Sequence, residues 1–90
     1  MLKMTEQIFS IGELVKEYKL LSYIKEKEPC FTELKRFCKY NFISLNKVDL
    51  MVIERLVKEH YTEDNKVKYS ITSKGEETLR LLKFALKILR

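Results

Sequence analysis

The sequence predicts one small α+β domain, mostly helical, in which a single β-hairpin precedes the last helix. Its 90 residues leave room for one hydrophobic core and not for two. Along most of the chain, apolar residues recur at steps of three and four, the period of a helix. Near residue 68 they recur at steps of two, the period of a strand. Contents of 46% apolar and 34% charged residues, with two Gly and one Pro, exclude a disordered or loop-rich chain.

A capping box predicts the first helix. Ser10 and Glu13 lie three residues apart, the spacing at which a hydroxyl and a carboxylate each satisfy a free amide of the first turn. An apolar stripe follows at helical spacing and comprises Leu14, Tyr18, Leu21 and Ile24. We expect this helix to end by Lys27, because Pro29 disfavours helical geometry at Glu28. Residues 1–10 are expected to form an N-terminal extension.

Two more helices are predicted, joined by a short turn. Cys30-Phe31 is an apolar link that suits a short strand, and Thr32 is expected to cap a second helix over residues 33–40. Asn41-Phe42-Ile43 forms the turn, and Ser44 caps a third helix that runs to about Glu59. The expected inward stripe of this third helix comprises Leu45, Val48, Val52 and Leu56, with Ile53 beside it. Two helices joined by a tight turn form a helix-turn-helix arrangement.

The period then changes to that of a strand. Polar and apolar residues alternate through Lys66, Val67, Lys68, Tyr69, Ser70 and Ile71. This alternation predicts a half-buried strand with a lysine-rich outer face. Asp64-Asn65 suits a tight turn because both residues tolerate positive φ, so residues 61–63 are expected to form the partner strand.

The last predicted helix is apolar over more than half of its circumference. Thr72 is expected to cap it, and it covers residues 74–90. One apolar row comprises Leu79, Leu82, Leu86 and Leu89, and a second row comprises Leu81, Ala85 and Ile88, with Phe84 beside it. One face can pack on its own domain, but a 90-residue chain has little left to cover the other, so we expect a second copy of this helix to do so. The first row, Leu79, Leu82, Leu86 and Leu89, is the predicted dimer interface.

The order helix, short strand, helix, turn, helix, hairpin, helix is that of a winged helix-turn-helix protein. Residues 69–76, with an aromatic, an aliphatic, Thr and then Lys-Gly, resemble the segment that joins the wing to the last helix in many small prokaryotic winged-helix regulators. Residues 44–56 are similar to their recognition helices. With its long last helix, the chain most resembles the compact archaeal and archaeal-virus regulators that dimerise through that element.

The resemblance covers residues 12–90 and implies one winged-helix domain over residues 1–90. Its three-helix core and β-hairpin wing would occupy residues 11–73, and a C-terminal dimerisation helix residues 74–90. One position departs from the pattern. Such proteins usually carry Gly just after the third helix, where the chain reverses in left-handed geometry. His60 stands there in this sequence, and we expect it to take that cap position.

Positive charge is concentrated in parts of the chain. The net charge is +5, and residues 34–48, 65–75 and 78–90 hold bases without acids. On the third helix, Asn46 suits adenine, Lys47 suits guanine and Leu50 suits a thymine methyl; Glu54 and Lys58 are expected on the same face. Bases on the second helix and on the wing are expected over phosphates. The candidate DNA contacts are Lys35, Arg36, Lys39, Ser44, Asn46, Lys47, Leu50, Lys66 and Lys68.

These observations predict a homodimeric, sequence-specific regulator of transcription that binds double-stranded DNA. Its third helix would enter the major groove, and its wing would lie on the phosphate backbone. Two alternatives remain open: a winged-helix module that binds protein or organises the nucleoid, and a last helix that lies on a membrane surface. The acids of the third helix, Asp49 and Glu54, and the modest net charge favour the protein-binding alternative.

Other classes of function find no support in the sequence. One His and two Cys cannot form a four-ligand zinc site in one subunit, and we expect no metal, no cofactor and no catalysis. No small-molecule ligand is evident, and no apolar run is long enough to span a membrane. Reduced thiols at Cys30 and Cys38 indicate a cytoplasmic protein. We expect it to associate with the nucleoid or, if it is viral, to occupy the cytoplasm of the host. An intersubunit disulfide through either thiol remains open.

Overall fold

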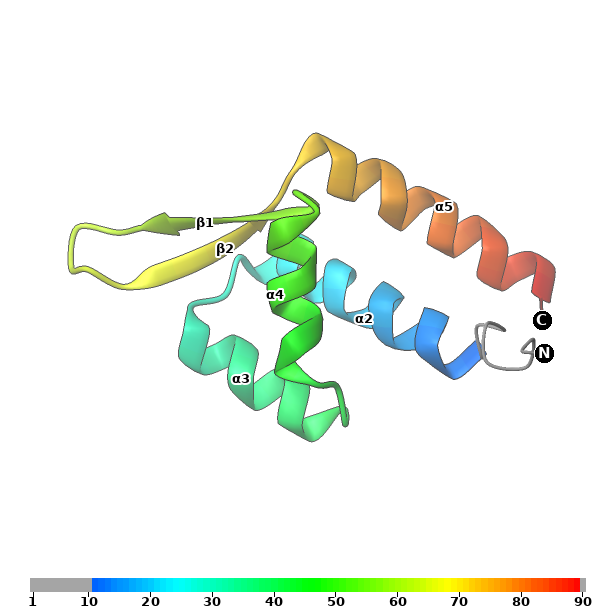
Figure 1. Cartoon of the computed structure of the whole chain (residues 1–90), viewed down its shortest axis with the longest axis horizontal. Helices are drawn as coiled ribbons and strands as arrows, with labels where there is room; N and C mark the ends of the chain where they lie inside the picture. Colours follow the sequence, from blue (N-terminus) through cyan, green and yellow to red (C-terminus); the bar gives the residue numbers. More distant parts are fainter. Residues whose placement is uncertain (1–10, 90) are drawn as a thin grey trace.

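The computed structural model describes residues 11–89, which form helices and one antiparallel β-hairpin (Figure 1). The elements of this range are α2 (Ile11–Lys27), α3 (Phe31–Tyr40), α4 (Leu45–Ile53), β1 (Val57–Tyr61), β2 (Val67–Ile71) and α5 (Ser73–Leu89). The predicted α+β, mostly helical class is confirmed, and the order is compatible with a winged-helix layout. The expected N-terminal extension and the Ser10 end of the first capping box lie outside the described residues.

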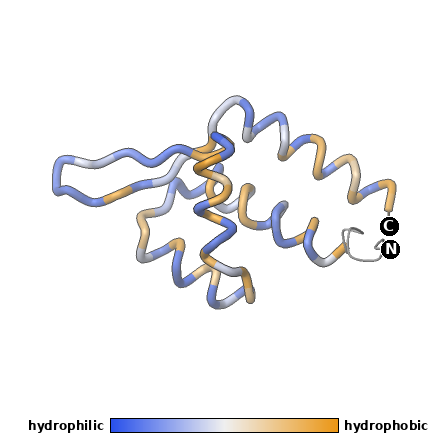
Figure 2. Tube along the Cα trace, viewed as in Figure 1, coloured by the Kyte–Doolittle hydropathy of each residue, from blue (hydrophilic) through white to orange (hydrophobic). Residues whose placement is uncertain are grey.

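The hydrophobic core lies where the helices and the base of the hairpin meet. Helices α2 and α5 run side by side, α4 packs against β1 at the base of the hairpin, and the hairpin projects away from the helices (Figure 1). Every described element contributes to one cluster, which includes Leu20, Leu21, Ile24, Leu34, Cys38, Val48, Met51, Val57, Tyr69 and Leu82. Figure 2 shows that apolar residues continue along α5 to its C-terminal end, whereas the hairpin loop is hydrophilic. No helix between residues 11 and 89 has the length and hydropathy needed to cross a bilayer.

Helix α4 ends six residues earlier than predicted, and the chain reverses at Arg55. Arg55 has a φ of 65°. The amide of Leu56 donates to the carbonyl of Met51 at 2.8 Å, and the amide of Arg55 donates to that of Val52 at 3.0 Å. This pair of bonds is a Schellman motif, in which the left-handed residue is usually Gly. The expectation for His60 is therefore wrong, because the reversal is complete five residues before it.

An earlier end of α4 moves the first strand as well. The predicted partner strand over residues 61–63 is corrected to β1, and His60 pairs with Lys68 in its ladder. The turn was predicted correctly, since Asn65 has a φ of 62°. Ser70 was expected on the exposed face but is 7% exposed. Residues 29–30 lie along the edge of β2 that does not pair with β1, and Cys30 forms a β-bridge with Lys68 there.

Helix α3 begins two residues earlier than predicted. Thr32 is not its N-cap; Cys30 is, and its amide donates to the Oε1 atom of Glu33 at 3.1 Å. This hydrogen bond lowers the pKa of the Glu33 carboxyl. The expected strand at Cys30-Phe31 is reduced to the single bridge at Cys30. A capping box without Ser or Thr was not recognised in the sequence.

A hydrogen-bonded joint ties the end of α4 to the beginning of α5. Thr72 was correctly predicted to cap the last helix: its Oγ1 atom accepts from the amide of Gly75 at 3.0 Å. The same hydroxyl contacts the carbonyl oxygens of Arg55 and Leu56 at 2.6 and 3.0 Å. The ammonium of Lys74 donates to the carbonyl of Glu54 at 2.9 Å. The joint therefore fixes where the hairpin leaves α4 and where it enters α5.

Candidate functional site

The predicted phosphate contacts of α3 are all at the surface. Lys35, Arg36 and Lys39 are exposed, and none of them forms an ion pair within residues 11–89. Lys35 and Lys39 lie one helical turn apart, so they share a side of α3. The three cations are therefore available to an anionic partner.

Helix α4 exposes a face with little positive charge. Ser44 caps the helix as predicted, since its Oγ atom accepts from the amide of Asn46 at 3.2 Å. Asn46 and Leu50 are exposed, as expected for contacts to a partner. Ile53 is 72% exposed, although the sequence placed it beside the inward stripe. The stripe is completed instead by Met51, 5% exposed, which periodicity alone did not select. We call Asn46, Asp49, Leu50 and Ile53 the outer face of α4.

Lys47 lies on a different side of α4 from Asn46 and Leu50. Its ammonium is 2.9 Å from the Oε1 atom of Glu13 and 3.8 Å from the Oε2 atom of Glu17, both on α2. The hydrogen bond and charge of Lys47 lower the pKa of the Glu13 carboxyl. The Lys47 side chain is 22% exposed. The sequence does place two acids, Glu13 and Glu17, one turn apart on α2, but no local pattern indicates that Lys47 is their partner.

The hairpin carries both predicted lysines, together with acids that balance them. Lys66 is exposed and Lys68 is half-buried. Lys58, expected on the third helix, is instead on β1. It pairs with Ser70, and Ser70 lies two residues from Lys68 on β2, so Lys58 and Lys68 share a face of the hairpin. Residues 57–71 hold as many acids as lysines: Lys58, Lys66 and Lys68 against Glu59, Glu63 and Asp64. The positive charge therefore lies mainly on α3 and α5, which each have a net charge of +2, and not on the hairpin.

Tyr69 anchors the hairpin to the core. Its side chain is 5% exposed, and its hydroxyl donates to the Oε2 atom of Glu59 at 3.3 Å. Burial and the neighbouring Glu59 carboxylate raise the pKa of Tyr69 to about 12. The amide of Tyr69 also donates to the carbonyl of Pro29 at 2.9 Å. Tyr69 is thus a structural residue of the hairpin base.

Part of the predicted dimer row of α5 is buried against the rest of the same chain. Leu82 and Leu86 are 8% and 7% exposed, and Leu79 is half-buried against the core; Leu89 is 51% exposed. The exposed apolar residues belong to the second row: Leu81, Phe84 and Ile88 are 60%, 62% and 66% exposed. We call these three residues the outer row of α5. Periodicity found both rows, but only the packing of α5 on α2 decides which row faces outward.

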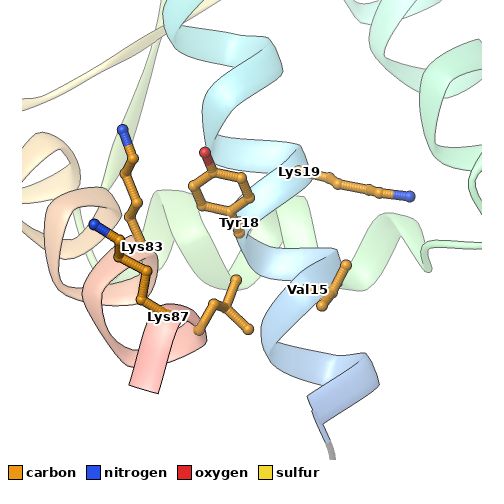
Figure 3. Close-up of a pocket in the computed structure, with 6 residues that line it drawn as sticks. Val15, Tyr18, Lys19, Lys83 and Lys87 are labelled. Atoms are coloured by element: carbon orange, nitrogen blue, oxygen red, sulfur yellow. The ribbon is translucent and has the colours of Figure 1, made fainter. Parts of the chain in front are cut away.

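A hollow of about 320 Å³ lies between α2 and α5 (Figure 3). It is lined by Val15, Tyr18, Lys19, Lys83, Leu86 and Lys87. Figure 3 shows Lys83 and Lys87 on the α5 side and Lys19 projecting away from Tyr18. The hollow has an apolar floor and no acid in its lining, and it is distant from the hairpin. It contains neither a nucleophile–base pair nor a set of metal ligands.

The thiols and acids of residues 11–89 do not form a reactive cluster. Cys30 and Cys38 are free thiols, and burial raises the pKa of the Cys38 thiol. No group of three or more His, Cys, Asp or Glu side chains in this range could hold a metal ion. The candidate sites are therefore surfaces: the cations of α3, the outer face of α4, the hairpin and the outer row of α5.

Comparison with known proteins gives no relative from which a function could be transferred: no family model, no curated protein and no solved structure matches the chain. What the fold defines is a class, a small helical domain with a projecting hairpin. Its function has to be argued from the surfaces described above.

Proposed function

We propose that the protein is a winged helix-turn-helix regulator of transcription that binds specific double-stranded DNA as a homodimer. The observation that carries the proposal is the set of cations on α3, the helix that the turn joins to α4: Lys35, Arg36 and Lys39 are exposed and form no ion pair within residues 11–89. Phosphate contacts of this kind fix the register of a recognition helix on the duplex. Lys66 and Lys68 would add contacts from the hairpin.

Sequence would be read by the outer face of α4. A major groove about 12 Å wide admits one helix. Asn46 can pair with adenine through two hydrogen bonds, and Leu50 and Ile53 can pack on thymine methyl groups. Asp49 can accept a hydrogen bond from the amine of cytosine. In this arrangement Lys47 positions α4 against α2 through Glu13, rather than reading guanine.

The outer row of α5 would join two copies. Leu81, Phe84 and Ile88 are large, exposed and aligned along one side of the helix, so a second α5 can bury them across a two-fold axis. Two recognition helices would then meet half-sites about 34–36 Å apart. Leu89, half exposed at the end of α5, would extend this seam.

The deciding experiment is selection of bound duplexes from a random library. The proposal expects a palindromic sequence with a fixed half-site spacing, and an affinity that falls with salt at a slope of about −0.9 per phosphate contacted. A bound pool without sequence preference would indicate an architectural module instead. A flat salt response would rule out recognition through phosphates.

A pair of matched variants locates the phosphate contacts. Lys35→Ala with Lys39→Ala should weaken binding to every duplex by a similar factor and reduce the salt slope by about 2. Lys19→Ala with Lys27→Ala removes the same charge from the exposed side of α2 and should leave the slope unchanged. Equal losses for the two variants would show that only net charge matters.

A protein-binding module is the second candidate, favoured by the composition of the outer face of α4. Because Lys47 is paired with Glu13, this face presents Asp49, Leu50 and Ile53 without an available cation. The variant Ile53→Lys separates the two candidates. If α4 binds DNA, the added charge should strengthen binding to unrelated duplexes while the lost thymine contact weakens the preference for the selected sequence. If α4 binds a protein partner that buries Ile53, binding of that partner should be abolished.

A further inference from the structure

The turn between α3 and α4 exposes two aromatic rings beside two cations. Tyr40 is 83% exposed and Phe42 is 85% exposed, the two highest values among the large apolar side chains of residues 11–89. Together with Arg36 and Lys39 they line one open hollow of about 610 Å³. No acidic side chain contributes to its lining. The end of α3 therefore exposes an aromatic surface with two cations that form no ion pair among the described residues.

Phe42 costs the folded chain stability and gains no burial in return. Its φ is 57°, and it takes the left-handed position of a Schellman motif: the amide of Ile43 donates to the carbonyl of Cys38 at 2.8 Å. Left-handed geometry is costly for a bulky side chain and nearly free for Gly. With 85% of Phe42 exposed, the ring contributes almost no packing that would offset this cost. Its use must come from something that covers it.

The chemistry around the ring favours a DNA strand as the cover. Arg36 and Lys39 suit the phosphates of a strand, and the apolar atoms next to those phosphates, deoxyribose carbons and thymine methyl groups, suit a phenyl ring. The turn leads directly into Ser44 and Asn46, which begin the proposed reading helix. A neutral apolar partner would leave both cations without a counter-charge.

We propose that Phe42 packs on apolar atoms of the DNA strand whose phosphates Arg36 and Lys39 bind, with Tyr40 flanking the same strand. This proposal rests on the proposed function. It adds an apolar contact at the edge of the groove to the base contacts made by α4. It also explains why a left-handed position is occupied by Phe: the ring serves binding at the expense of stability.

The test is Phe42→Gly, measured for both stability and affinity on the selected duplex. The melting temperature should rise by about 3–5 °C, because the strain of left-handed Phe is removed. The affinity should fall about tenfold, the size of one lost base contact. Glu28→Gly is the matched control, since Glu28 is exposed and has a φ of 43°. It should not lower the melting temperature, and it should cause no loss of affinity.

Replacing thymine by uracil in the duplex identifies the atoms that the ring touches. If Phe42 contacts the methyl group of one thymine, a duplex with uracil at that position alone should bind the wild-type protein about tenfold more weakly and the Phe42→Gly variant with no further loss. Uracil at the thymines that Leu50 and Ile53 contact should weaken the binding of both proteins. If the ring packs on deoxyribose, Phe42→Gly should weaken both duplexes equally. Both results support the contact.

Three outcomes would overturn it. Wild-type binding of the duplex together with unchanged affinity of Phe42→Gly refutes the contact and leaves the proposed function standing; the ring would then belong to a protein interface. A lower melting temperature of Phe42→Gly would mean that the ring stabilises the chain itself. A wild-type protein that binds no duplex refutes the proposed function and this contact together.

Discussion

The two ends of α4 are held in different ways. At its C-terminal end, Thr72, Lys74 and Gly75 hydrogen-bond within a joint that includes the carbonyls of residues 54–56. At its N-terminal end, an exposed cap at Ser44 and the ion pair of Lys47 with Glu13 attach the helix to its surroundings. At the first end, the side chains of Thr72 and Lys74 bond to backbone groups, whereas at the second end the contacts are an exposed cap and an ion pair between side chains.

This difference determines which part of α4 can adjust. Bonds to backbone carbonyls at a partly buried joint are costly to break, whereas exposed ion pairs contribute little and are screened by salt. The angle between α4 and the hairpin is therefore fixed. The beginning of α4, where the proposed base contacts lie, can shift slightly on a partner at low cost. Four substitutions or conditions test this contrast, taken here from the largest expected effect to the smallest.

Gly75→Ala should cause the largest loss, because the joint has no space for a methyl group. A Cβ atom at Gly75 would overlap the carbonyl oxygen of Leu56 and lie 2.6 Å from the Cγ1 atom of Ile71. We expect a loss of about 3 kcal/mol or more in the free energy of unfolding, measured with urea. The control is Gly12→Ala on the exposed beginning of α2, which should gain about 0.5 kcal/mol from helix propensity. Similar effects at both glycines would contradict the tight joint.

Thr72→Val should be the next most destabilising change. It keeps the shape of the side chain but removes the hydroxyl that contacts Arg55 and Leu56 carbonyls and accepts from Gly75. We expect a loss of about 2 kcal/mol in the free energy of unfolding, since several polar groups lose a partner at once. Thr72→Ser, which retains the hydroxyl, should recover most of it. If serine fails to rescue, the methyl group and not the hydrogen bonds supports the joint.

Ser44→Ala should have a smaller effect at the other end of α4. It removes the hydroxyl that accepts from the amide of Asn46, at a cost of about 1 kcal/mol. Ser44→Asp should restore stability, because a carboxylate also caps a helix and interacts favourably with its N-terminal dipole. Thermal unfolding of the three proteins measures the effect, and a loss as large as that of Thr72→Val would erase the contrast between the two ends.

The pH dependence of the Lys47 pair should be the smallest effect. The folded pKa of Glu13 is lowered, so its contribution is fully present above the pKa of the unfolded chain, about 4.3. This contribution is lost as the pH falls through the lower, folded pKa. Melting temperatures measured from neutral to acidic pH should therefore decline slightly less steeply for Lys47→Met than for the wild-type protein. Parallel curves would show that the pair adds nothing to stability.

Local patterns predicted most of the elements, and long-range packing accounts for what they missed. The caps at Ser44 and Thr72 and the turn at Asn65 each act within four residues, so these roles could be predicted from neighbouring positions. The bonds from Thr72 to the carbonyls of Arg55 and Leu56 connect distant positions and could not be predicted in this way. The end of α4 was missed because Arg55 occupies a left-handed position in which Gly is the usual signal. A capping box at Cys30 was missed for a similar reason.

The candidate site was harder to predict than the fold. Lys47 was assigned to the reading face, but its partner Glu13 is 34 positions earlier in the chain, beyond any local pattern. The two apolar rows of α5 are equivalent in the sequence, and only the contact with α2 distinguishes Leu82 from Phe84. The charge of residues 65–75 includes Lys66 and Lys68, whereas the complete hairpin also includes Glu59 on β1 and Glu63 and Asp64 in the loop.

The outer row of α5 lies beside unpaired lysines, and this has a consequence for assembly. Lys83 and Lys87 form no ion pair within the part of the chain that the structure describes, and both are exposed next to Phe84 and Ile88. Two copies joined along this row would bring like charges together, so dimer formation should be favoured as ionic strength rises. Binding to DNA is weakened by the same change. Occupancy of paired half-sites should therefore pass through a maximum at an intermediate salt concentration, on either side of which one of the two equilibria fails.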